Sequence, residues 1–168
     1  MFKPLTNSVA SAFWMVYHIF SDPVVLRECR AEVEQLVKVD SNGVRTVDLA
    51  KVKSSCPILL STRQETLRYV HIGILARVVM EDIMFDNKYL SRKGATVMSA
   101  TPIQHTDASV WGSTVGIFDY CRFLRGPGGE RTNPAAFRSF GGGTVLCPER
   151  YFVSTEVMLF AALLLTPL

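Results

Sequence analysis

The feature that most constrains this chain is a run of three glycines, residues 141–143, followed four residues later by Cys147. Neighbouring residues without Cβ atoms let the backbone adopt positive φ and lie close against a flat partner. The apolar residues after Cys147 predict a helix. The thiol should then lie at a helix N-terminus, where backbone N–H groups and the helix dipole favour a thiolate. Because the thiolate is the form that binds metals, Cys147 is a candidate metal ligand.

Three further motifs precede this loop, and all four occur in the same order as in one known family. Residues 65–68 read E-T-L-R, residues 105–112 match H-x-D-x-x-x-W-G, and residues 118–123 read F-D-Y-C-R-F. A four-residue match such as E-x-x-R arises by chance in many chains, whereas the four motifs together span nearly the whole sequence. The chain therefore resembles the C-terminal part of the cytochrome P-450 family, the haem-thiolate monooxygenases.

The resemblance implies a mainly α, α+β fold formed by the C-terminal part of the cytochrome P-450 fold. Its expected elements are the end of the I helix, the J, K and L helices, a small β-sheet, the meander and the cysteine-ligand loop. The chain has 168 residues, well under half of the length expected for the family. Residues 1–168 are therefore interpreted as a single partial domain that lacks the N-terminal majority.

Several residues match positions that hold haem in the family, and the resemblance implies the same roles for them. Cys147 would be the axial ligand of the haem iron, and Arg77, nine residues beyond Arg68, would bind a haem propionate. A guanidinium suits that task because it stays charged and offers two donors to a carboxylate. Phe140 would pack against the porphyrin ring, and Gly143 would permit the close approach of the loop.

A buried structural triad is also expected. Glu65 and Arg68 stand three residues apart, so they share one face of a helix and can pair. The family buries this glutamate between two arginines, and the resemblance makes Arg122 the second of them. The alternative is an exposed ion pair of little energetic value. His105 is assigned a structural role and not a ligand role.

Asn7 and Ser8 match the place where many family members carry an acid–alcohol pair that delivers protons to bound dioxygen. By resemblance they are the candidate catalytic residues. An amide at this place is found in a branch that includes sterol hydroxylases and prostacyclin-type isomerases. The alternative is that both residues cap a helix, because the chain begins shortly before them.

The chain departs from the family pattern beside Cys147. The usual continuation is C-x-G-x-x-x-A, but Glu149 replaces the glycine and Val153 replaces the alanine. If the turn after Cys147 needs a left-handed backbone at position 149, a side chain there costs roughly 1–2 kcal/mol. Val145 also replaces a common basic residue, and Tyr120 stands where the meander commonly has proline.

Two readings of the function follow. In the first, the chain resembles a haem-thiolate monooxygenase that uses dioxygen and electrons from an NADPH-dependent reductase to oxidise a small apolar metabolite in fungal secondary metabolism. The haem would perform the oxidation, and the thiolate would push electron density toward the iron. In the second, favoured by the enlarged residues beside Cys147, the chain is a truncated or decayed remnant without catalysis. A phosphate-binding role is disfavoured because no Lys-Ser or Lys-Thr follows the glycines.

Composition excludes several other classes. A hydrophobic content of 48% excludes a disordered tail, and a net charge of +3 with interspersed signs argues against a nucleic-acid partner. The spacings of Cys29, Cys56, Cys121 and Cys147 match neither a zinc site nor a disulfide framework. The first three are therefore expected to be ordinary half-buried thiols in an intracellular, reducing compartment.

No membrane span is expected within this chain. The apolar run 157–165 is far shorter than the roughly 20 residues that a bilayer requires, and the N-terminus does not read as a signal peptide. The resemblance implies that full-length relatives in eukaryotes are anchored to the endoplasmic reticulum membrane through an N-terminal segment, and that anchor is expected to be absent from residues 1–168.

The rest of the pattern predicts where the helices and strands lie. Asp22 should cap a helix that has Pro23 in its first turn. Turn residues are expected at 40–43 and a flexible surface loop at 126–130. The expected helices lie at about 7–20, 23–38, 47–53 and 57–70, and the expected strands at 73–80, 83–85 and 96–100.

Overall fold

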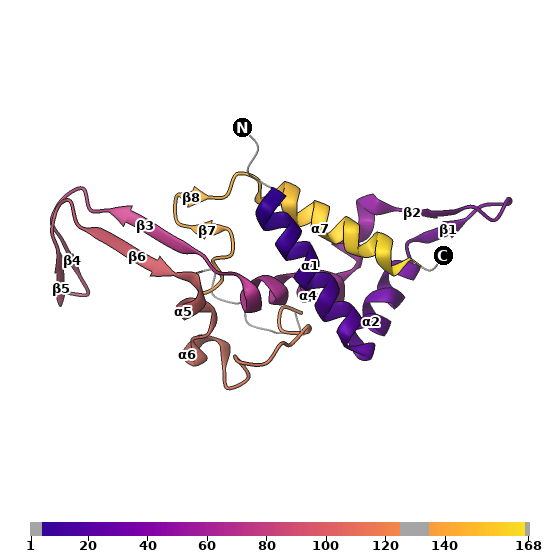
Figure 1. Ribbon diagram of the computed structural model, residues 1–168, viewed down its shortest axis with the longest axis horizontal. Coiled ribbons are helices and arrows are strands. Elements are labelled where there is room, and N and C mark those ends of the chain that lie inside the picture. Colours follow the sequence, from indigo (N-terminus) through magenta and orange to yellow (C-terminus); the bar gives the residue numbers. More distant parts are fainter. Residues whose placement is uncertain (1–4, 125–134, 167–168) are drawn as a thin grey trace.

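The computed structural model describes residues 5–124 and 135–166, which form a helical body with a β ribbon leaving it at each end (Figure 1). The body consists of the long helices α1 (Leu5–Ser21), α2 (Pro23–Glu34), α4 (Pro57–Val70) and α7 (Arg150–Leu165). One ribbon pairs β1 (Val37–Val39) with β2 (Arg45–Val47), and the other pairs β3 (Ile74–Val78) with β6 (Thr96–Ala100). This mixture of helices and small sheets confirms the predicted α+β class.

The shorter elements connect these parts. They are η1 (Leu49–Lys51), α3 (Val52–Ser55), β4 (Ile83–Phe85), β5 (Tyr89–Ser91), α5 (Thr101–His105), α6 (Ala108–Trp111), β7 (Gly141–Gly142) and β8 (Val145–Leu146). The predicted surface loop at 126–130 lies outside the described residues.

The junction between α1 and α2 forms as the sequence predicts, but α2 ends sooner. The Asp22 side chain accepts hydrogen bonds from the backbone N–H groups of Val24 and Val25, and Pro23 occupies the first turn. The helix stops at Glu34, so the expected extension to residue 38 was wrong. The alternating V-K-V of β1 pairs with β2 instead, and the Asp40 carboxylate closes the turn.

Helix α4 has the predicted bounds, and a side chain from α2 holds its N-terminus. The Glu32 carboxylate accepts hydrogen bonds from the backbone nitrogens of Ile58 at 2.8 Å and Leu59 at 2.9 Å. These N–H groups have no partner within a helix, so Glu32 acts as a cap supplied from another element. The short helix expected at 47–53 forms later, as η1 and α3, because residue 47 belongs to β2.

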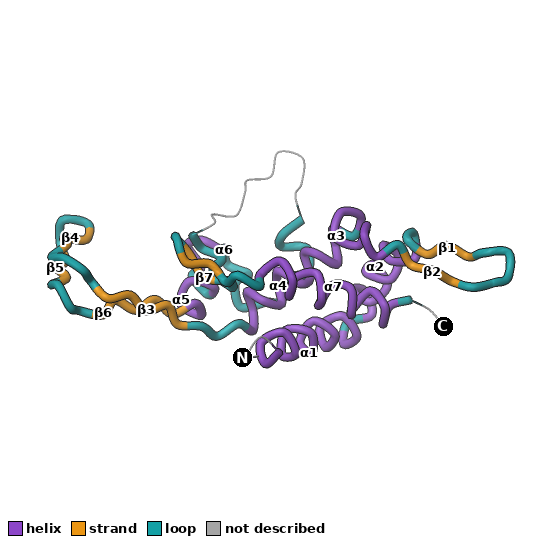
Figure 2. Tube along the Cα trace, turned by 90° about the horizontal axis from the view of Figure 1, so that it is seen from above, coloured by secondary structure: helices purple, strands orange, loops and turns teal. Residues whose placement is uncertain are grey.

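The core lies where α1 packs against α2, α4 and α7, and α7 runs beside α1 (Figure 2). Cys29 and Cys56 are fully buried within it, so the expectation that they are half-buried was wrong; Cys121 is half-buried as expected. Burial raises the pKa of the Cys29 thiol to about 12 and that of Cys56 to about 11. The core side chains include Met15, Ile19, Val25, Cys29, Val33, Cys56, Leu59, Val157, Met158, Ala161 and Leu165.

The strands after α4 form separate antiparallel pairs. In the first, Arg77 of β3 lies opposite Val97 of β6. At the far end β4 pairs with β5, which the sequence did not predict, around a turn in which Asp86 and Asn87 have φ of 50° and 52°.

In the part of the chain that the structure describes, no single helix is long and apolar enough to cross a membrane. Residues 7–21 and 23–34 pass a test of length and composition together, but they are bent by 108° at their break.

Candidate functional site

The cysteine loop is a tight hairpin that ends at the start of α7. β7 pairs with β8, and the Cys147 backbone N–H donates to the Phe140 carbonyl at 2.9 Å. Gly141 and Gly143 have φ of +87° and +66°, which favour glycine. A Cβ on Gly141 would also lie 2.8 Å from the Val145 carbonyl oxygen. The glycines are therefore required by the hairpin itself.

Cys147 lies three residues before the first residue of α7, as the sequence predicts. Its thiol is half-buried, and its carbonyl accepts hydrogen bonds from the backbone nitrogen and from Nη1 of Arg150. Position 149 does not need a left-handed backbone, because Glu149 has φ of −87°. The expected conformational penalty of a side chain there was therefore wrong. The carboxylate of Glu149 remains beside the cysteine as an exposed group.

The Cys147 loop forms one wall of a cleft of about 500 Å³. Helix α1 contributes the polar residues Asn7 and Ser11 to the lining of this cleft. The end of α4 and the start of β3 contribute a further wall that includes His71 and Leu75. The loop side presents Phe140, Cys147, Glu149 and Val153. The predicted iron ligand and the predicted ring contact therefore face the same cleft.

The two candidate catalytic residues do not share this cleft. Asn7 lines it, whereas Ser8 is 4% exposed and lines an apolar groove between α1 and α7. Ser11, and not Ser8, lines the cleft together with Asn7, and its hydroxyl donates to the Asn7 carbonyl at 2.8 Å. Residues four apart lie on one face of a helix, so the spacing of Asn7 and Ser11 was the signal that sequence reasoning missed.

Arg77 is exposed on β3, and its Nη1 donates to the Ala76 carbonyl. Leu75, two residues earlier, lines the cleft. Ile74, whose side chain alternates with that of Leu75, lines the cleft as well, so strand alternation does not assign Arg77 to a cleft face, and Arg77 itself lies outside the cleft lining. His71, for which the sequence gave no site, lines the cleft, and burial lowers its pKa.

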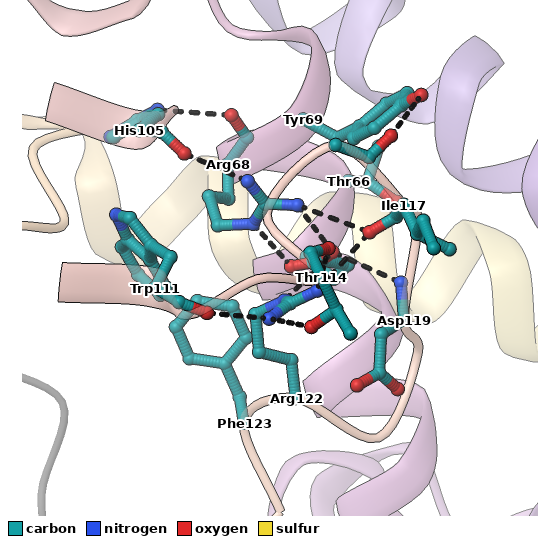
Figure 3. Close-up of polar contacts among 12 residues, drawn as sticks. Thr66, Arg68, Tyr69, His105, Trp111, Thr114, Ile117, Asp119, Arg122 and Phe123 are labelled. Atoms are coloured by element: carbon teal, nitrogen blue, oxygen red, sulfur yellow. Dashed lines mark hydrogen bonds and ion pairs between the residues drawn. The ribbon is translucent and has the colours of Figure 1, made fainter. Parts of the chain in front are cut away.

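The structure brings Glu65, Arg68 and Arg122 together in the interior. Figure 3 shows the side chains of the two arginines and the polar contacts around them. Arg68 meets the Glu65 carboxylate with two hydrogen bonds of 2.7 Å, and Arg122 Nε donates to it at 3.1 Å. The Asp119 backbone N–H donates to the same carboxylate at 3.0 Å. Glu65 and Arg68 are 0% and 2% exposed, so this is a buried network rather than a surface pair.

The two arginines also hold the segment from α5 to residue 124. Arg122 Nη2 donates to the carbonyls of Thr114 at 2.9 Å and Ile117 at 3.1 Å. Arg68 Nη1 donates to the His105 carbonyl at 2.8 Å. The side chains of the triad therefore satisfy backbone carbonyls that would otherwise need water.

The residues around the cleft fit haem in most respects. A sulfur donor at a helix N-terminus, an aromatic side chain at Phe140 and apolar residues such as Leu75 suit a flat apolar macrocycle with one metal ion. The exposed Glu149 carboxylate on the same wall is the one group that opposes it, because a negative charge disfavours a neighbouring thiolate.

A family model described as cytochrome P-450 matches residues 6–167. The cytochrome P-450 monooxygenase nodJ of Hypoxylon pulicicidum is 34% identical over 173 residues, covering 96% of this chain and 34% of that protein. A cytochrome P-450 monooxygenase of Gibberella zeae is 32% identical, covering 96% of this chain and 32% of that protein. The 25-hydroxycholesterol 7-alpha-hydroxylase of Rattus norvegicus is 26% identical, covering 99% and 43%. The chain thus spans about a third of the length of the two fungal relatives.

Proposed function

Because this chain belongs to the cytochrome P-450 family, we propose that it carries the cysteine-ligand part of a haem-thiolate monooxygenase and that Cys147 binds the haem iron. The observation that supports this most is the cleft, where the Cys147 thiol, Phe140 and the polar residues of α1 face a common space. The buried triad holds the neighbouring segment in place and takes no part in the chemistry.

Haem, when bound, would supply the oxidation of a substrate by dioxygen. Cys147 would hold it through the thiolate, and Phe140 would pack against the ring. Asn7 and Ser11 would place polar side-chain atoms in the same cleft, where they could hold a proton donor. Arg77, which lies on β3 outside the cleft lining, would have to turn its side chain to reach a propionate.

The finer parts of the proposal rest on resemblance. The substrate would be a small apolar metabolite, the electrons would come from an NADPH-dependent reductase, and the setting would be fungal secondary metabolism at the endoplasmic reticulum membrane. Two fungal relatives whose names include monooxygenase support the reaction class.

Reconstitution with haem tests the ligand directly. The reduced, carbon-monoxide-treated chain should show a thiolate-type Soret band that Cys147→Ala abolishes. Cys121→Ala is the matched control, since both thiols are half-buried. Survival of the band in Cys147→Ala would refute the assignment.

A second candidate function is a remnant of such an enzyme that has no catalysis, and the observation favouring it is the position of Glu149 and Val153 on the cleft wall. Since the backbone at 149 is unstrained, charge is the reason to expect an effect. Glu149→Gln and Glu149→Gly should then improve haem retention to a similar degree. If neither variant changes retention, Glu149 does not hinder the site and this candidate loses its support.

A further inference from the structure

We propose that His105, held as one neutral tautomer, is a positioning residue that joins the Glu65–Arg68 helix to the segment leading into the Cys147 loop. Its carbonyl belongs to the triad network described above, but its imidazole makes separate contacts. The significance of this link for haem rests on the proposed function, whereas the link itself is a property of the chain alone.

The hydrogen bonds of the ring fix the tautomer. The backbone N–H of Arg138 donates to His105 Nε2 at 3.1 Å. A backbone nitrogen can only donate, so Nε2 must present its lone pair and the proton must be on Nδ1. Nδ1 lies 3.1 Å from the Arg68 carbonyl oxygen, which can only accept. Both ring nitrogens are therefore used, in one arrangement.

Residues 68 and 105 are held to each other in both directions. His105 Nδ1 donates to the Arg68 carbonyl, and Arg68 Nη1 donates to the His105 carbonyl at 2.8 Å. Arg68 is itself fixed by its two bonds to Glu65. The imidazole is fully buried and stacks on Phe137, with ring centroids 5.6 Å apart. The ring therefore has a defined position and little freedom to rotate.

Two main-chain hydrogen bonds connect the segment from Arg138 onward to Cys147. The Arg138 carbonyl accepts from Gly141 N–H at 3.1 Å, and the Phe140 carbonyl accepts from Cys147 N–H at 2.9 Å. Loss of the bond from Arg138 to the imidazole would remove this main-chain anchor of Arg138, which lies three residues before β7 and accepts from its first residue. The bond thus couples the buried triad to the loop that presents the thiol.

The haem-free full chain provides the first test. Nitrogen-15 NMR of the His105 imidazole should show Nδ1 protonated and Nε2 unprotonated. This readout distinguishes the proposed link from simple packing, which would not select a tautomer. A protonated Nε2, or a ring that averages between the two tautomers, would overturn the proposal. Since no variant and no haem are needed, failure of the haem assignment would leave this result intact.

Two substitutions provide the second test. The His105→Gln side-chain amide reaches about as far as Nε2 and can still accept from Arg138, whereas that of His105→Asn reaches only as far as Nδ1. Exchange of the Arg138 amide hydrogen should be about tenfold faster in His105→Asn than in His105→Gln, as expected for one buried hydrogen bond. His71→Gln replaces the imidazole next to His105 and should leave the exchange rate of the Arg138 amide hydrogen unchanged. Equal protection in the two His105 variants would overturn the proposal, and if His105→Asn does not fold, the tautomer measurement decides.

Discussion

The His105 link connects the triad region with the loop that lines the cleft. The two regions differ in whether their polar groups are buried and paired or left exposed. At the triad, the fully buried Glu65 carboxylate accepts four hydrogen bonds from this chain's own nitrogens. At the cleft, Cys147 is half-buried, while Asn7 and Glu149 are exposed. A buried charge must be fully paired, so the first region is built for stability. The second leaves its polar groups accessible to a ligand.

The comparison predicts that substitutions at the triad change folding and that substitutions at the cleft change ligand binding. Glu65→Ala should lower the free energy of unfolding by roughly 3–5 kcal/mol, because it leaves Arg68 and Arg122 buried without their carboxylate. Urea denaturation measures this. Glu149→Ala is the matched control and should leave the midpoint nearly unchanged. A midpoint that Glu65→Ala does not shift would break the comparison.

The next effect concerns pH. Burial lowers the pKa of His105 to about 4, from an ordinary value of 6.5. The unfolded chain therefore binds more protons between these values, so stability is present above pH 6.5 and is lost as pH falls toward 4, by about 3 kcal/mol. Unfolding measured at several pH values should show this slope, and His105→Gln should reduce it. An unchanged slope in that variant would assign the effect to other groups.

A smaller effect is expected at the N-terminus of α4, which carries the triad. Glu32→Ala removes the carboxylate that caps this helix and should lower stability by about 1–2 kcal/mol. Glu34→Ala, at an exposed position of α2, the helix that carries Glu32, is the control. Equal effects of the two substitutions on the thermal midpoint would show that the cap does not stabilise α4.

The smallest effect on stability should come from the cleft. Ser11→Ala removes only a hydroxyl that bonds within its own helix, so the change should be within about 0.5 kcal/mol. Haem titration of the same variant should nevertheless differ from wild type if Ser11 faces the bound group. If Ser11→Ala instead caused a large loss of stability and left haem affinity unchanged, Ser11 would belong with the residues that stabilise the fold and not with those that bind a ligand.

Sequence reasoning predicted α4, the Asp22 cap and the Glu65–Arg68 pair, because each leaves a local signature in residue type, and the family resemblance supplied Arg122 as the second partner of Glu65. It missed Ser11, since the choice between Ser8 and Ser11 depends on how α1 is rotated against its neighbours. It also missed the hydrogen bond from the Arg138 backbone N–H to His105. Any residue except proline provides such a donor, so the type of residue at position 138 does not indicate this bond.

The packing of α7 on α1 has a consequence for the order of folding. These helices are separated by most of the described sequence, yet Met15 and Ile19 belong to the same core cluster as Val157 and Met158. Contacts between distant segments form late, because the intervening chain must first be brought together. During synthesis α1 emerges with this apolar side uncovered until α7 has been made. Binding of chaperones to the nascent chain would therefore be expected to last at least until α7 has been synthesised.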